Sequence, residues 1–113
     1  MAYDYERDER GKLRMNGERR AVRKIVRDLL SAGYEISIDN GAEENELNNS
    51  RDENEIMRSL FACDEEVLIV RRVGEREDTP ATRGFVRLVY GNSPEEVVCD
   101  YSMNLDAIVG GPR

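Results

Sequence analysis

Three runs of β-forming residues follow one another near the end of the chain, and they constrain the fold more than any other feature. The runs are VLIVRRV at 67–73, FVRLVY at 85–90 and VVCDY at 97–101. They are rich in β-branched and aromatic residues, which favour strands. Each run is short enough to be one strand of a single sheet.

The two connections between these runs have the composition of hairpin loops. Residues 74–83 contain a glycine, a proline and mixed charges, and residues 91–95 read GNSPE. The second connection has an alternative interpretation as a phosphate-binding loop, which needs backbone N–H groups converging at a helix N-terminus. A hairpin is favoured because Pro94 has no N–H and because another strand, not a helix, follows. Consecutive hairpins predict an antiparallel sheet.

Upstream, a helix and a strand are indicated by their different periods. Apolar residues at helical spacing predict a helix over 17–32, with Gly33 at its C-terminal cap. Residues 34–38 alternate as a strand does, and the Asp-Asn-Gly sequence that follows is strong turn chemistry. A weak return strand is expected around 44–48.

A second helix is expected over 51–62, with Ser50 and Glu53 forming a capping box at its start. A short helix that Ser102 caps and Gly110-Gly111-Pro112 ends closes the chain, with Leu105, Ile108 and Val109 packing inward. The predicted fold class is therefore α+β: an antiparallel sheet of four to five strands, with two main helices and a short C-terminal helix mostly on one face. We expect residues 1–14 to be a flexible charged tail and residues 15–113 to be one domain.

Charge is unevenly distributed along the chain. The formal net charge is −7, yet residues 1–33 carry more basic than acidic side chains, and residues 39–66 carry ten acidic side chains against two arginines. The acidic balance argues against direct wrapping of DNA, which requires neutralisation of phosphates. The basic side chains of the first helix would contact phosphates, face solvent or contact the acidic region.

Reaction chemistry is not indicated by the residues. The chain has no histidine, which removes the commonest acid–base catalyst near neutral pH, and no nucleotide fingerprint is present. Carboxylates near residue 43 would suit Ca²⁺ or Mg²⁺, but an EF-hand pattern fails at Ile36 and Leu47, so a solvated loop is favoured. We expect no enzyme activity, no catalytic residue, no metal and no cofactor.

The compartment is inferred from weaker signals. The first residues are charged and have no apolar segment, unlike a secretory signal, and no run is long enough to span a bilayer. We expect Cys63 and Cys99 to be small buried residues, with Cys99 on the same strand face as Val97 and Tyr101. These features predict a cytoplasmic protein with no membrane partner.

Two surfaces are candidate binding sites. The first is an acidic face that would bind a partner protein by imitating the charge of nucleic acid, and it comprises Asp39, Glu43, Glu44, Glu46, Asp52 and Glu55. The second is an alternative site for a small anion such as a nucleotide, and it comprises Arg71, Arg72, Arg83 and Arg87. Both sets also suit an ordinary solvated surface.

Four stretches, taken in order, resemble a family of small accessory proteins of tailed bacteriophages and prophages. They are GERRAVRKIVRDLLSAGYEISIDNG, SRDENEIMRSLFACDEEVL, GFVRLVYGN and VVCDYSMNLDAIV, which together span residues 17–109. The resemblance implies a phage protein made in the cytoplasm of a host bacterium. It implies non-catalytic binding of a host bacterial protein, most concretely inhibition of a defence or nucleic-acid-handling protein. Self-association as a homodimer is also expected.

Overall fold

Five strands form one antiparallel sheet in the order β2-β1-β3-β4-β5. Their bounds are β1 Tyr34–Asp39, β2 Leu47–Ser50, β3 Glu65–Arg72, β4 Arg83–Val89 and β5 Val98–Tyr101. The computed structural model describes residues 9–74, 82–91 and 93–110. The predicted antiparallel sheet is confirmed, including the weak second strand and both hairpins, because β3 pairs with β4 and β4 with β5.

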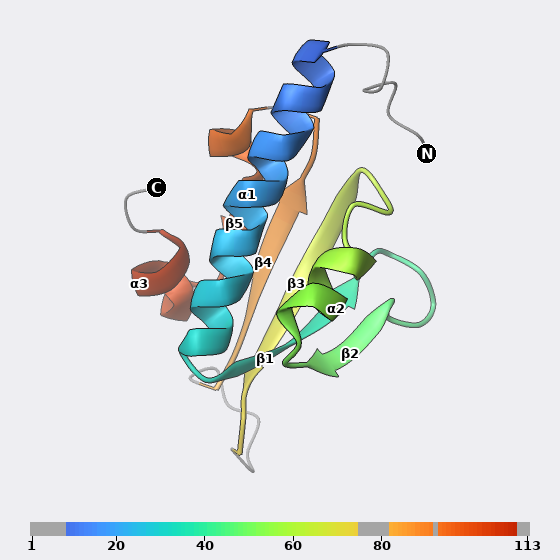
Figure 1. The fold of residues 1–113 in the computed structure, drawn as a ribbon. Helices are drawn as coiled ribbons and strands as arrows, with labels where there is room; N and C mark the ends of the chain where they lie inside the picture. The colour runs from blue at the N-terminus through green and yellow to red at the C-terminus, as the bar shows by residue number, and fades with distance from the viewer. Residues whose placement is uncertain (1–8, 75–81, 92, 111–113) are drawn as a thin grey trace.

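In the described part of the chain, three α-helices lie on one face of this sheet (Figure 1). They are α1 Glu9–Ser31, α2 Glu53–Ser59 and α3 Asp106–Val109, and the single-turn helices η2 Pro94–Glu96 and η3 Met103–Leu105 flank β5. The predicted α+β fold is therefore correct.

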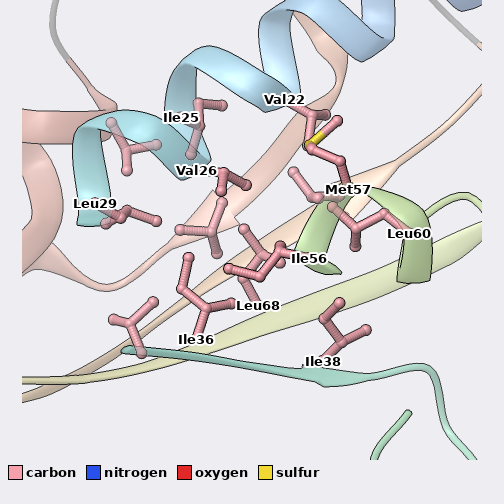
Figure 2. Packing of buried hydrophobic residues seen from close by; sticks show 14 of the residues in the cluster. Val22, Ile25, Val26, Leu29, Ile36, Ile38, Ile56, Met57, Leu60 and Leu68 are labelled. Atoms are coloured by element: carbon pink, nitrogen blue, oxygen red, sulfur yellow. The ribbon is translucent and has the colours of Figure 1, made fainter. Parts of the chain in front are cut away.

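The core lies between α1, α2 and the inward face of the sheet (Figure 2). Val22, Val26 and Leu29 project from one stripe of α1 and are fully buried, as the helical spacing of apolar residues predicts. The sheet contributes side chains from alternate strand positions, among them Ile36 and Leu68, which are also fully buried. Each such side chain contributes roughly 1.5–3 kcal/mol through the surface that it removes from water.

The boundaries of the first helix differ from the prediction at one end. Helix α1 begins at Glu9, not near Gly17, so residues 9–14 of the expected tail are helical, and residues 1–8 lie outside the described part of the chain. The predicted end is correct. Gly33 has φ +94°, and its N–H donates to the carbonyl oxygen of Leu30.

The predicted capping box of the second helix is wrong. The N-cap of α2 is Asp52, whose carboxylate accepts from the N–H groups of Asn54 and Glu55 at 2.9 and 3.2 Å. The hydroxyl of Ser50 instead donates to the Glu55 carboxylate at 2.7 Å. A seven-residue helix is marginal alone, so this cap and the burial of Ile56 hold α2 in place.

A bulge changes which side chains of β5 face inward. The register of β4 and β5 shifts between Arg87 and Leu88, so that Leu88 lies opposite Val98 and Val86 lies opposite Tyr101. Cys99 is consequently exposed, while Cys63 is half-buried. The expectation that both cysteines are buried, and that Cys99 shares the inward face of its strand, is therefore wrong.

Candidate functional site

Residues directly opposite each other in an antiparallel pair share a face, so the registers define the side of the sheet away from the helices. We call it the open face; its side chains are Glu35, Ser37, Asp39, Glu65, Val67, Ile69, Arg71, Arg83, Phe85, Arg87, Val89 and Asp100. Its apolar members are half-buried rather than buried.

The open face is arranged in four rows across the strands, and the last of them contains Glu65 and Val89. Glu35, Arg71 and Arg83 lie opposite one another in the first row, and Ser37, Ile69 and Phe85 in the second. The third row contains Asp39, Val67, Arg87 and Asp100. The rows place apolar side chains in the middle of the face and charged side chains at both ends.

The four predicted anion-binding arginines do not form one cluster. Arg71 and Arg83 lie directly opposite each other on the open face. Arg87 lies on the same face, where its guanidinium pairs with the Glu65 carboxylate at 2.9 Å. Arg72 does not join them, because its guanidinium lies 5.1 Å from the ring centroid of Tyr34, whose side chain is buried on the helix-covered side.

A groove of about 620 Å³ adjoins Arg83 on the open face. Its lining includes Val67, Ile69, Phe85 and Met103, and Met103 is 82% exposed. The groove thus joins one arginine to an apolar and aromatic floor. Sequence reasoning missed this floor, although the signal was present: VLIVRRV is apolar at four successive positions, so both faces of that strand carry apolar side chains.

The six predicted acidic residues occupy two different structural settings. Asp52 and Glu55 belong to the N-terminal cap of α2. Asp39 is the last residue of β1, and the other three lie in the connection to β2; we call residues 39–46 the acidic loop. The structure therefore does not bring all six together as one face with a single role.

Hydrogen bonds from its own backbone order the acidic loop. The Asp39 carboxylate accepts from the N–H of Gly41 at 2.8 Å, and the Asn40 side-chain oxygen accepts from the N–H of Ala42 at 3.2 Å. The N–H of Glu46 donates to the Ile38 carbonyl oxygen at 2.9 Å. These bonds hold the loop while leaving the side chains of its three glutamates exposed.

The basic side chains of α1 contact the acidic region within the same chain, as one of the sequence interpretations expects. The Glu53 carboxylate of α2 accepts from Arg23 at 2.6 Å and from Arg27 at 3.0 Å. Hydrogen bonds from Arg27 and then Arg23 lower the pKa of Glu53 to about 2. Part of the basic face of α1 is thereby neutralised by α2.

A buried carboxylate lies beneath the helices and was not foreseen. Glu66 is fully buried, and its Oε1 atom accepts from the Tyr90 hydroxyl and from the Phe61 N–H, each at 2.7 Å. Its Oε2 atom has no hydrogen-bond partner among the residues that the structure describes. Burial raises the pKa of Glu66. The sequence did contain a signal for this burial, because Glu66 precedes Leu68 by two residues and therefore lies on the same inward side of β3.

Glu66 is enclosed rather than accessible to a substrate. The Phe61 ring, on a residue with φ +68°, stacks on Tyr90 with 4.3 Å between ring centroids. Within the described residues, no group of three or more histidine, cysteine, aspartate or glutamate side chains is arranged to hold a metal ion. No described helix is both long and apolar enough to cross a membrane.

Comparison with known proteins identifies no relative. No protein-family model matches the chain, and neither a curated protein nor a solved structure is significantly similar to it. Function must therefore be argued from the surfaces described above.

Proposed function

We propose that this protein is a non-catalytic binding protein, a phage accessory protein that blocks a host bacterial protein, and that its acidic loop makes the contact. A host defence or nucleic-acid-handling protein is the most concrete target, because such proteins carry basic grooves that match phosphate-like charge. The proposal places the contact in the host cytoplasm and involves no cofactor.

One observation carries this proposal: the loop presents ordered carboxylates whose charge is not neutralised by the described part of the chain. Glu43 and Glu44 are exposed, and no described basic side chain pairs with either of them. Glu53, by contrast, has two arginine partners. Because Coulomb attraction between unpaired charges steers partners together, the loop is better suited to an external basic surface than the α2 carboxylates are.

The test is affinity capture of a partner from lysate of a bacterial host by the wild-type chain and by two matched variants. Glu43→Lys/Glu44→Lys reverses two charges on the acidic loop, and Glu95→Lys/Glu96→Lys reverses two equally exposed charges on η2. We expect the same protein to be captured by the wild type and by the η2 variant, to be lost from the loop variant, and to dissociate as salt rises.

Retention of that protein by the loop variant would contradict the proposal. Equal loss from both variants would also contradict it, because net charge rather than the loop would then determine binding. Thermal melting of each variant shows whether the loop variant is folded.

A second candidate function is sequestration of a nucleotide signal, and the groove beside Arg83 favours it. An aromatic ring such as Phe85 gives a base a stacking surface, and an arginine binds phosphate through two parallel hydrogen bonds. A ligand that binds only the native state must raise the melting temperature at saturation. The expected result is a shift with one member of a nucleotide panel that Arg83→Gln removes; no shift at millimolar concentration would exclude this function.

A further inference from the structure

The charges of the open face are segregated by strand. The charged side chains that β1 contributes to this face are the carboxylates of Glu35 and Asp39, while those of β4 are the guanidiniums of Arg83 and Arg87. One further carboxylate, Asp100 of β5, lies opposite Arg87. Strand β3 lies between them. A surface that is acidic on one side of a central line and basic on the other is complementary to a second copy of itself.

The rows make this complementarity specific. Glu35 and Arg83 lie in the same row at equal distances on either side of β3, and Asp39 and Arg87 do so two rows further along. A two-fold axis along β3 would therefore place Glu35 of one copy against Arg83 of the other, and Asp39 against Arg87. Each contact would occur twice, as an isologous interface requires.

The other aligned arrangement is disfavoured by the same charges. A two-fold axis perpendicular to the strands would place β4 over β4, bringing Arg83 against Arg87, and would place β1 over β1, bringing Glu35 against Asp39. Like charges that face each other across an interface oppose association. The charge pattern thus selects one of the two in-plane axes.

Apolar side chains occupy the middle of the same face. Val67 and Ile69 of β3 lie on the proposed axis, and Phe85 lies beside Ile69. All three are half-buried, so a second copy would remove further apolar surface from water. Two charged side chains also lie on the axis, so Arg71 of one copy would face Arg71 of the other and Glu65 would face Glu65. Each has an opposite charge nearby that offsets this repulsion: Arg71 is opposite Glu35, and Glu65 pairs with Arg87.

We propose that two copies of this chain pack open face to open face about an axis along β3. Aligned packing of two sheets is a standard arrangement, with the inner faces about 10 Å apart. Such packing would cover the groove lined by Arg83 and Phe85, so dimer formation and nucleotide binding are competing uses of one surface. The acidic loop glutamates lie outside the paired rows, so the dimer does not depend on the function proposed above.

The area predicts a weak dimer. The five strands have 6, 4, 8, 7 and 4 residues, so at about 3.4 Å per residue and about 4.8 Å between strands they span a face of roughly 470 Å² per copy. The total of roughly 950 Å² is below the 1,200–2,000 Å² that is usual for stable complexes. We therefore expect a concentration-dependent equilibrium with a dissociation constant in the micromolar range or above.

Sedimentation velocity from about 1 µM to about 1 mM tests the proposal. We expect wild-type chain to shift from monomer to dimer, and Glu35→Arg and Arg83→Glu each to raise the dissociation constant at least about tenfold. The combination of both substitutions exchanges the charges and should restore the dimer to within about threefold of wild type. Arg58→Glu, on the exposed surface of α2, makes the same charge change away from the face and should have no effect.

The combined variant keeps the test decisive if a single variant folds poorly, because it has the same net charge as the wild type and Glu35 and Arg83 lie on strands that do not pair with each other. A wild-type chain that stays monomeric at every concentration would overturn the proposal. So would a dimer that neither single variant weakens, or a combined variant that remains as weak as the single ones.

Discussion

The replacement Glu66→Gln should change how stability depends on pH. Glu66 is fully buried, and the carboxylate of Glu46 adds to burial in raising its pKa. The hydrogen bonds from Tyr90 and Phe61 act in the opposite direction, yet the net shift is upward. Glutamine reproduces the shape of the protonated acid, and its oxygen can accept the same two hydrogen bonds, but it does not titrate.

The direction in which stability changes with pH follows from the number of protons that each state binds. In the unfolded chain Glu66 ionises near its ordinary pKa of about 4.3, whereas in the folded chain it keeps its proton to higher pH. Between these two pKa values the native state binds one more proton than the unfolded state. As the pH rises between these two values, the free energy of unfolding of the wild type, measured relative to Glu66→Gln, should therefore fall by up to about 1.4 kcal/mol per pH unit. The fall ends above the pKa of the folded state.

Urea denaturation of both proteins at intervals from pH 4.5 to pH 8 measures this difference. Starting at pH 4.5 avoids the opposite effect of Glu53, whose pKa is lowered to about 2 and whose contribution is lost only as pH falls below about 4. If the two stability curves stay parallel over the whole range, Glu66 titrates normally in the folded protein and the reasoning fails.

Two further substitutions test the packing of α2. Asp52→Ala removes the N-terminal cap and should destabilise the domain by about 1 kcal/mol, seen as a melting temperature lower by about 4 °C, while Asp52→Asn should retain most of the stability. Ile56→Ala leaves a cavity at a fully buried position and should lower the free energy of unfolding, measured by urea denaturation, by about 2–5 kcal/mol. Ile56→Val should lower it by about 1 kcal/mol. A smaller loss for Ile56→Ala than for Ile56→Val would contradict the burial of this side chain.

The element order was predictable because it depends on local periodicity. The spacing of Val22, Val26 and Leu29 identifies a helix without knowledge of its neighbours, and hairpin loops identify which strands are adjacent. The cap of α2 was less predictable because Ser50 and Asp52 both suit an N-cap, and the ends of a helix vary by one or two residues.

The predicted binding surfaces depended on the register of the strands, which a single sequence does not specify. Arg72 and Arg71 are adjacent in the chain but lie on opposite faces of β3, so the predicted arginine group was divided. Glu53 acquired two arginine partners only because α2 packs beside α1. The strand-by-strand separation of charge on the open face likewise follows from the pairing of β1 and β4 with β3, which joins residues far apart in the sequence.

Both outer strands of the sheet are short and irregular. Strand β2 has four residues, a shifted register against β1 and Asn49 at φ +50°, while β5 has four residues and the bulge. A peptide that extends a sheet by adding a strand needs a long, regular row of unpaired N–H and C=O groups. Neither border offers one among the described residues, so this sheet is poorly suited to accept an added strand from another chain.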